Sequence, residues 1–467
     1  MNMEQQVSRR SFLRLAALTA GSLAAGRAFP ATAAVVASAP TSAPTTAERP
    51  APKGRPWYEL GIMNDPVLNN QLLWYLSAVY QGMADVGECL DTAHRIDPKD
   101  AWSWPREWVR TADRLRGLAE GSLARSHALS AGEAYLRAAT YYRAALIHHP
   151  EPSDPGVVGA TRQSIACFDQ AIGLLGIPAR PVRIPYEGTT LPGYFYRSPI
   201  ERRSPLARDK APVLIVHEGR DAWPEETKYL ADACVKRGYH CLQFAGPGQG
   251  AAIRLQGLPF RPDWEKVVTP VVDYAVSLPE VDPERIALMG ISMGGALAPR
   301  AAAFEKRLKV CIANPGVLSW ADAIIGNFAE YPVLIKLLDT SPEAFNKAVW
   351  GFLKAAALAG DHLMSSATWW LKDSMWKHGV NTPVELIAEL RKYTNADVAD
   401  QITCRVLVMD GAAEEFSAGQ AQKLYDALCC PKDYMLFTAE DTGLVHCQTG
   451  ALAVATQRMF DWLDEYL

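Results

Sequence analysis

A serine between two glycines follows a short apolar run in the second half of the chain. Residues 286–291 are mostly apolar and lead into a Gly-x-Ser-x-Gly motif formed by Gly290, Ser292 and Gly294. This motif is typical of a nucleophile elbow, a sharp turn between a strand and a helix that presents the serine over the end of a sheet. Glycines are needed on both sides because a β-carbon would collide with the strained turn. We predict that Ser292 is a nucleophile and that the N–H of Met293 stabilises negative charge on a substrate oxygen.

The motif alone would also fit a glycine-rich turn that serves packing, so a base and an acid must be found downstream. His446 lies in a loop between the last predicted strand and the final helix, where a general base is expected. His217 ends an earlier predicted strand and is the alternative base, although it precedes the serine in the chain. The other histidines lie mostly in predicted helical regions, where surface or capping roles would account for them.

The acid should follow the predicted strand at residues 405–409. Asp410 ends that strand directly, whereas Glu414 lies further out on the loop that must reach the imidazole. We therefore predict that Glu414, rather than Asp410 or Glu415, orients the base and stabilises its protonated form.

A second oxyanion donor is expected from the loop at residues 217–221, which follows another predicted strand. We predict that the N–H of Arg220 is this donor, with the N–H of Gly219 as the alternative. The loss of one such donor typically lowers the rate about a hundredfold to a thousandfold.

These residues need a sheet to position them, and the chain from residue 179 onward predicts one. Residues 182–186 and 191–196 read as an antiparallel hairpin, after which strands alternate with helices. Residues 213–216 are rich in β-branched side chains, which is typical of a buried parallel strand. This order predicts an α/β-hydrolase fold with a mostly parallel sheet over residues 179–467.

Two helical segments accompany the predicted sheet. Residues 51–178 place apolar side chains at intervals of three and four and contain no strand-like run, which predicts a helical domain. Residues 321–397 interrupt the alternation of strands and helices with helical patterns rich in aromatic side chains. We predict a cap that excludes water and shapes the substrate pocket, although a merely packed insertion would fit the pattern as well.

Residues 1–50 are predicted to be a signal peptide and a flexible leader. Arg9 and Arg10 precede a mild apolar run and a series of small residues, which is typical of a twin-arginine export signal. The apolar run is too short and too weak for a membrane span. We expect the twin-arginine export machinery as a partner, cleavage near Ala33, and a periplasmic or secreted bacterial protein.

The composition is that of an ordinary globular protein. A chain of 467 residues with 49% hydrophobic and 21% charged residues can bury a large core and hold an accessory domain. The net charge of -4 and the lack of a basic, aromatic run argue against binding to nucleic acid or an anionic membrane. The nine cysteines show no metal-ligand spacing, so we predict neither a metal nor a cofactor.

Several motifs together resemble a known family. They are Gly290-Ile291-Ser292-Met293-Gly294-Gly295, Gly246-Pro247-Gly248-Gln249-Gly250, Asp410-Gly411, Gly419-Gln420, His446-Cys447-Gln448 and residues 185–194. With the helical domain, they resemble the α/β-hydrolases related to dihydroxypseudooxynicotine hydrolase and the fungal polyketide-shortening hydrolases. The resemblance implies a serine hydrolase that cuts a carbon–carbon bond next to a ketone, or an ester or amide, in a cavity between the helical domain and the sheet. It also implies homodimers.

The chain departs from the resembled family at several positions. Relatives usually have aspartate where this chain has Glu414, and they often have acidic residues in place of Ala245 and Ala251. We predict a serine hydrolase that acts on a small molecule through Ser292, His446 and Glu414 and an acyl-enzyme. Hydrolysis of an ester, amide or peptide is the alternative within the enzyme class, and a hydrolase-fold binding protein with an impaired triad is the alternative outside it.

Overall fold

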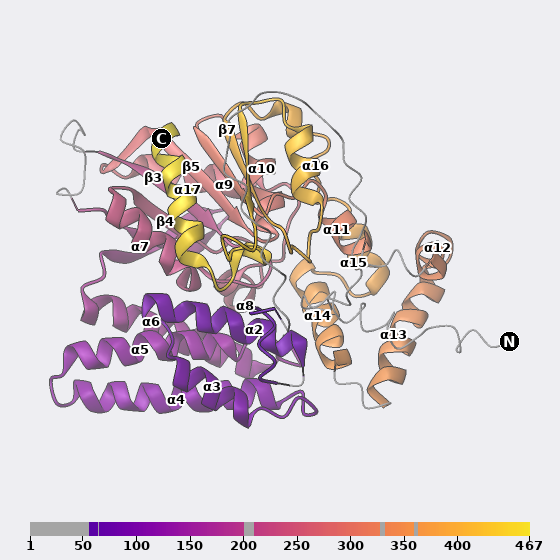
Figure 1. Cartoon of the computed structure of the whole chain (residues 1–467), viewed down its shortest axis with the longest axis horizontal. Helices are drawn as coiled ribbons and strands as arrows, with labels where there is room; N and C mark the ends of the chain where they lie inside the picture. Colours follow the sequence, from indigo (N-terminus) through magenta and orange to yellow (C-terminus); the bar gives the residue numbers. More distant parts are fainter. Residues whose placement is uncertain (1–55, 64, 200–209, 327–331, 359–362) are drawn as a thin grey trace, which may run out of the picture.

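An eight-stranded sheet forms the centre of the molecule (Figure 1). The structure is a computed structural model that describes residues 56–63, 65–199, 210–326, 332–358 and 363–467. The strand order is β1-β2-β4-β3-β5-β6-β7-β8. The strands are β1 (Ala179–Tyr186), β2 (Thr189–Tyr196), β3 (Ala211–His217), β4 (His240–Phe244), β5 (Val281–Ile291), β6 (Val310–Asn314), β7 (Arg405–Gly411) and β8 (Lys432–Phe437). Strand β2 pairs in the antiparallel direction with β1 and β4, and all other pairs are parallel. The predicted hairpin and the α/β-hydrolase fold are therefore confirmed.

The sheet separates two apolar clusters, because successive side chains on a strand point to opposite faces. Val213 and Ile215 of β3 belong to one cluster, and Leu214 and Val216 belong to the other. The first face is covered by α9 (Glu265–Ser277), α10 (Gly294–Phe304) and α16 (Gln420–Ala427). The second face is covered by α7 (Lys228–Arg237) and α17 (Leu452–Tyr466). Burial on both faces explains the continuous apolar run of β3.

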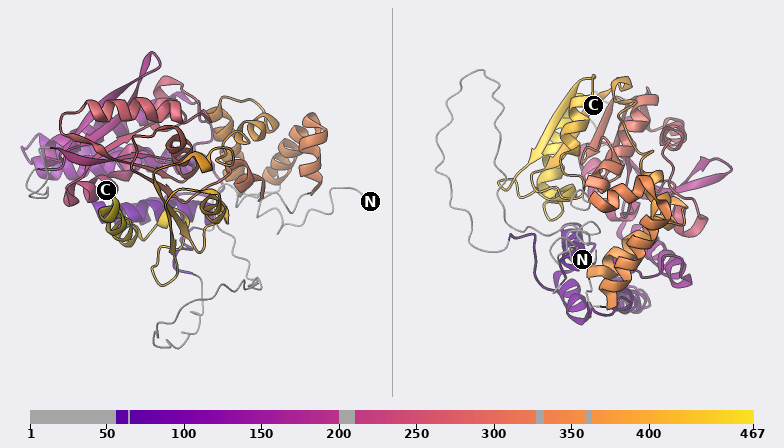
Figure 2. Two further views of the ribbon diagram at one scale, coloured as in Figure 1. Left: turned by 90° about the horizontal axis from the view of Figure 1, so that it is seen from above. Right: turned by 90° about the vertical axis from the view of Figure 1, so that its right-hand side faces the viewer.

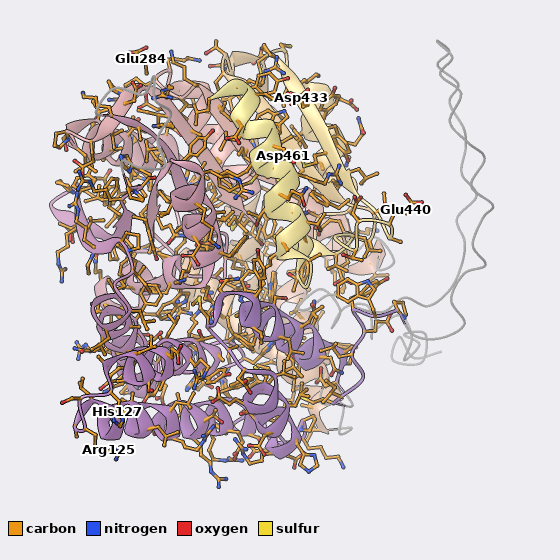
Figure 3. The ribbon with its side chains drawn as sticks, turned by 60° about the vertical axis from the view of Figure 1, so that its left-hand side comes forward. Arg125, His127, Glu284, Asp433, Glu440 and Asp461 are labelled. Atoms are coloured by element: carbon orange, nitrogen blue, oxygen red, sulfur yellow. The ribbon has the colours of Figure 1, made fainter. Side chains whose placement is uncertain are left out.

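A layer of helices lies against the carboxyl ends of the parallel strands. It contains α2 (Pro66–Ser77), α3 (Val86–Arg95), α4 (Ser103–Leu123), α5 (Ala128–Ala144) and α6 (Pro155–Leu175). In Figure 3, Arg125 and His127 mark the far end of this layer, whereas Glu284, near the start of β5, lies at the opposite end of the molecule. Strand β5 therefore runs toward the helical layer, and its carboxyl end faces it.

Among the described residues between β6 and β7, five helices form a second cover at the side of the sheet (Figures 1 and 2). They are α11 (Trp320–Gly326), α12 (Pro332–Thr340), α13 (Pro342–Leu358), α14 (Leu363–His378) and α15 (Pro383–Leu390). Their buried side chains, such as Phe345, Leu371 and Leu386, join the cluster on the α10 face of the sheet. We call these five helices the cap.

Two short elements follow strands β3 and β4. A 3₁₀ turn (Pro224–Thr227) precedes α7. The short helix α8 (Gly250–Gln256) follows β4.

Within the described ranges, no helix is both long and apolar enough to cross a membrane. The predicted twin-arginine segment lies outside the described residues.

Candidate active site

Ser292 occupies a strained turn between β5 and α10. Its φ angle is 59°, a left-handed conformation that residues with a side chain seldom adopt. A β-carbon on Gly290 would lie 2.0 Å from the carbonyl oxygen of Gly294, and one on Gly295 would lie 1.8 Å from that of Pro315. The backbone therefore crosses itself too closely for any side chain at these glycines. This geometry is that of a nucleophile elbow.

His446 and Glu414 meet Ser292 at the carboxyl edge of the sheet. The Nε2 atom of His446 lies 3.0 Å from the Oγ atom of Ser292. The Nδ1 atom of His446 lies 2.9 Å and 2.8 Å from the two carboxylate oxygens of Glu414. The structure thus brings the predicted nucleophile, base and acid into one hydrogen-bonded line.

The charges of this line favour an ionised carboxylate. Burial raises the pKa of Glu414, but the imidazole of His446 and the N–H groups of Ser417 and Phe416 outweigh burial and lower it below its usual value. Burial lowers the pKa of His446, but Cys447 and the Glu414 carboxylate outweigh it and raise that pKa well above 6.5. Glu414 therefore stabilises the protonated imidazole, as an acid in this position must.

The two other candidate acids do not contact the imidazole. Asp410 accepts hydrogen bonds from the hydroxyl of Tyr434 at 2.6 Å and from the N–H of Gly411 at 2.8 Å. Burial raises the pKa of Asp410 above its usual value. Burial and the Glu414 carboxylate raise the pKa of Glu415 to about 7.

The alternative base, His217, is a buried packing residue. Its ring lies 5.7 Å from the ring of Phe244 and 5.4 Å from that of Trp264. Burial lowers its pKa to about 4, so the ring is neutral at physiological pH. His148 and His378 were expected on the surface or at helix ends, and this expectation is wrong. Both are buried among aromatic rings, because a neutral imidazole packs well against such rings.

The loop that carries His446 is held from several sides. The ring of Phe416 lies 4.6 Å from the imidazole ring. The side-chain amide of Asn314, at the end of β6, donates to Gln448 at 2.8 Å. Two residues further along, the N–H of Gly450 donates to the hydroxyl of Ser77 in α2 at 2.7 Å. The helical layer therefore helps to position the predicted base.

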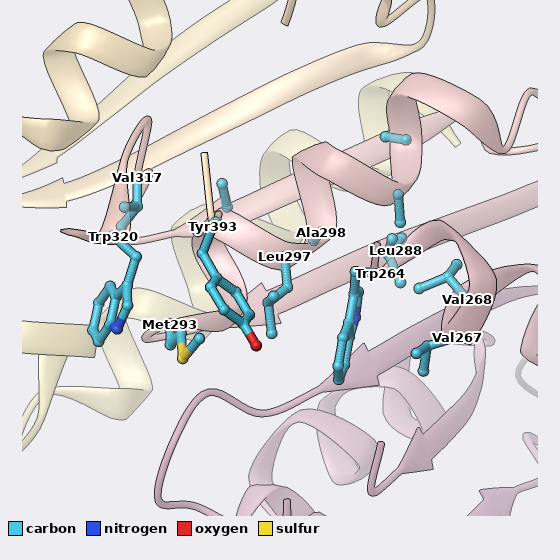
Figure 4. Packing of buried hydrophobic residues seen from close by; sticks show 14 of the residues in the cluster. Trp264, Val267, Val268, Leu288, Met293, Leu297, Ala298, Val317, Trp320 and Tyr393 are labelled. Carbon is cyan, nitrogen blue, oxygen red and sulfur yellow. The ribbon is translucent and has the colours of Figure 1, made fainter. Parts of the chain in front are cut away.

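The loop after β3 lies against the elbow, where the second oxyanion donor was predicted. A β-carbon on Gly219 would lie 2.6 Å from the backbone nitrogen of Met293 and 2.7 Å from the β-carbon of Ser292. Only glycine permits this approach, so the loop that carries the predicted donors packs directly on the elbow. Figure 4 shows the Met293 side chain in the same apolar layer as Trp320 and Tyr393. Its side chain thus anchors the residue in the core.

Only the backbone N–H of Arg220 was assigned a role by the sequence. Its side chain joins a buried ionic cluster. Its guanidinium contacts Asp373 at 2.6 Å and Asp221 at 2.7 Å, and it stacks on the rings of Trp369 and Trp370. Lys377, which is completely buried, contacts Asp373 at 2.8 Å and Asp221 at 3.0 Å. No sequence pattern indicated this cluster, which connects the loop after β3 to cap helix α14.

The same cluster reaches the backbone of the loop. The ammonium group of Lys377 donates to the carbonyl oxygen of Arg220 at 2.9 Å. The Arg143 side chain, from helix α5, donates to the carbonyl oxygen of Asp221. The cap and the helical layer therefore both contact the loop after β3.

A cavity of about 230 Å³ lies between the helical layer and the cap. Trp104 and His148 line it from the helical side, and Trp369 and Lys372 line it from the cap. Ser292 does not line this cavity, but Trp369 also stacks on Arg220. Among the residues that the structure describes, no cluster of three or more metal-ligating side chains was found.

The fold and this geometry define the class of protein. The α/β-hydrolase family model matches residues 213–449, just over half of the chain, and the chain belongs to this family. The hydrolase acrC of Aspergillus aculeatus is 32% identical over 422 residues, which cover 85% of this chain and 95% of that protein. The 20-hydroxy-prefusarin hydrolase FUS2 of Gibberella moniliformis is 32% identical over 412 residues, with 85% and 95% covered. These relatives confirm the predicted resemblance to fungal hydrolases and the prediction of a hydrolytic enzyme.

The solved structures show the same architecture. The crystal structure of 2,6-dihydroxy-pseudo-oxynicotine hydrolase superposes with a TM-score of 0.62 at 20% identity, and the match covers 84% of this chain and 95% of that chain. This likeness concerns the fold, including the helical segment that precedes the sheet.

Proposed function

We propose that this hydrolase cleaves an acyl bond through a nucleophilic serine and an acyl-enzyme. Ser292 attacks a substrate carbonyl while His446 takes its proton, and Glu414 orients and stabilises the imidazolium. The N–H groups of Met293 and Arg220 receive the developing oxyanion. The observation that carries this proposal is the 3.0 Å contact between His446 Nε2 and Ser292 Oγ, on an imidazole held by Glu414.

The proposed bond is a carbon–carbon bond next to a ketone. In a 1,3-diketone, attack on one carbonyl breaks the bond to the central carbon, and its electron pair leaves as the enolate of the other ketone. His446 returns its proton to that carbon, so the leaving group departs as a neutral ketone. Water then hydrolyses the acyl-enzyme, and the sum is one carboxylic acid and one ketone from one diketone and one water. The resemblance of the sequence motifs to the dihydroxypseudooxynicotine and polyketide-shortening hydrolases favours this reaction, and ester or amide cleavage is the alternative.

Product analysis of a small substrate panel tests the reaction. Wild-type protein and Ser292→Ala would be incubated with simple 1,3-diketones and with p-nitrophenyl esters, and the products would be followed by mass spectrometry. Paired acid and ketone products from the wild type alone would support carbon–carbon cleavage. Turnover of esters alone would favour the alternative. Equal rates for both proteins on every substrate would contradict the serine mechanism and favour a binding protein.

We also propose that the protein is exported by the twin-arginine route and acts in the periplasm or outside the cell. The Arg9-Arg10 pair and the small-residue stretch after it support export. Expression with and without Arg9→Lys and Arg10→Lys, followed by cell fractionation, tests this. Retention of the doubly substituted protein in the cytoplasm is expected, and unchanged export would contradict the proposal.

We further propose that the protein forms homodimers. Light scattering of the purified protein tests this proposal, and the mass of a monomer would contradict it.

A further inference from the structure

Gln249, in the Gly-Pro-Gly-Gln-Gly turn after β4, contacts the loop that follows β3. Its side chain is completely buried. Its amide nitrogen donates to two successive backbone carbonyl oxygens, those of Glu218 and Gly219, the second at 3.1 Å. Its amide oxygen accepts from the N–H of Gly246 at 2.9 Å. One side chain thus joins the two loops at the edge of the active site.

The two carbonyl groups that Gln249 binds belong to the peptide units that carry the candidate oxyanion donors. The carbonyl of Glu218 shares a peptide plane with the N–H of Gly219, and the carbonyl of Gly219 shares one with the N–H of Arg220. In a planar trans peptide, the C=O and the N–H point in opposite directions. A donor that holds both carbonyls on one side therefore directs both N–H groups to the other side.

The loop after β3 also lies directly against the elbow. Gly219 approaches the backbone of Met293 and the side chain of Ser292 so closely that a β-carbon would lie within 2.7 Å of both. In the described part of the chain, no acceptor is found for the N–H of Gly219, Arg220 or Met293. These N–H groups are therefore the candidate oxyanion donors.

We propose that Gln249 is a positioning residue that orients the oxyanion-binding peptides of the loop after β3. The inference rests on the proposed function, and it holds whether Arg220 or Gly219 supplies the second donor. Oxyanion donors act because they are already oriented before the reaction begins. A freely rotating peptide would have to reorient in each turnover, and this would raise the barrier.

The turn around Gln249 is shaped to place this side chain. Gly248 has a φ of +81°, and a β-carbon there would lie 2.2 Å from the ring of Phe260. A β-carbon on Gly246 would lie 2.6 Å from the ring of Trp264. These glycines let the turn pack against two aromatic rings of the core, so that Gln249 is held with its amide toward residues 218 and 219. Glutamine supplies a side chain of this length that carries both a donor and an acceptor without a charge.

The rate of serine labelling tests the proposal with Gln249→Met, which keeps the side-chain length and removes the amide. The second-order rate constant for labelling by a fluorophosphonate probe would be measured by intact mass, because the phosphoryl oxygen must also be stabilised as the serine attacks. We expect complete labelling at a rate about 10- to 100-fold lower, somewhat less than the loss of a whole oxyanion donor. With p-nitrophenyl acetate, kcat should fall and KM should change little, since the ground-state ester does not need the oriented peptides.

Gln243→Met is the matched control. Gln243 is also completely buried, and its amide donates two hydrogen bonds, at 2.7 Å and 2.9 Å, but both go to Thr227 and none goes to residues 218–220. A purely structural effect would lower the stability and the fraction of protein that labels in both variants. The positioning role predicts that only Gln249→Met lowers the rate constant of the folded protein.

The outcomes separate this proposal from the function on which it rests. Equal labelling rates for wild type and Gln249→Met, or equal losses in both variants, would overturn the positioning role. A wild-type protein that does not label would overturn the serine mechanism itself. If Gln249→Met does not fold, Gln249→Glu serves instead, because the carboxylate still accepts from Gly246 but cannot donate when ionised. A wild-type labelling rate in that variant would equally overturn the proposal.

Discussion

Glu414 holds the imidazole of His446 with both carboxylate oxygens, which lie 2.9 Å and 2.8 Å from Nδ1. The carboxylate is itself fixed by the N–H groups of Phe416 at 2.9 Å and Ser417 at 3.1 Å. The imidazole is therefore held in one orientation, with Nε2 toward Ser292. The loop after β7 folds around the Glu414 carboxylate through these two N–H groups. This fold lets the longer glutamate side chain reach His446.

Glu414→Gln should lower kcat by a factor of up to about 10⁴, because an amide can stabilise the wrong tautomer and cannot stabilise the imidazolium. Asp410→Asn and Glu415→Gln are the controls, since neither side chain contacts the imidazole. We expect both controls to stay within a few-fold of the wild-type kcat, measured on whichever substrate the panel identifies. A loss in Asp410→Asn with an active Glu414→Gln would show that the acid is Asp410.

The pH dependence of kcat/KM should show an acid limb above pH 6.5. Protonated His446 cannot take the serine proton, so activity appears only as the imidazole loses its proton. Cys447 and the Glu414 carboxylate raise the pKa of His446 against the effect of burial, and the limb rises with that pKa. Glu414→Gln removes the carboxylate, so its weaker activity should show a limb shifted to lower pH. An unshifted or upward-shifted limb would contradict the assignment.

Gly295→Ala should destabilise the fold, because the new β-carbon would lie 1.8 Å from the carbonyl oxygen of Pro315. Overpacking of this kind costs about 1–3 kcal/mol in the free energy of unfolding, which urea denaturation measures. Gly159→Ala in helix α6 is the matched control, since a β-carbon there meets no atom within 4 Å. That change should be neutral or stabilising by up to about 1 kcal/mol. Equal effects of the two substitutions would mean that the elbow is less closely packed than described.

Lys377→Met should lower the free energy of unfolding by about 1–3 kcal/mol, because the buried Asp373 carboxylate loses one of its two cationic partners and keeps only Arg220. Lys372→Met, on the same helix, is the control. Its ion pair with Glu151 is largely exposed, and such pairs contribute about 0–1 kcal/mol. Urea denaturation of both variants checks the difference, and a Lys377→Met variant as stable as Lys372→Met would show that the buried cluster adds nothing to stability.

The elbow and the succession of strands and helices along the chain could be predicted because they depend on local patterns. The spacing of Gly290, Ser292 and Gly294 reflects steric limits within a few residues, and the β-branched runs mark the parallel strands directly. Glu414 and His446 could be placed because parallel strands bring the loops at their carboxyl ends to one edge of the sheet.

The cluster of Arg220, Asp373 and Lys377 could not be predicted in the same way. Charged residues at helical spacing usually face solvent, and only the packing of the cap against the loop after β3 buries these. His148 and His378 were misplaced for the same reason, because the aromatic rings around them come from distant segments. The role of Gln249 depends on contacts between two loops 30 residues apart, which no local pattern reveals.

The most direct test of the central claim is the intact mass of the protein after treatment with a fluorophosphonate probe, compared between wild type and Ser292→Ala. An activated Ser292 predicts one probe adduct per wild-type chain and none on Ser292→Ala. An adduct on both proteins would place the reactive group elsewhere, and no adduct on either would contradict an activated serine at this site.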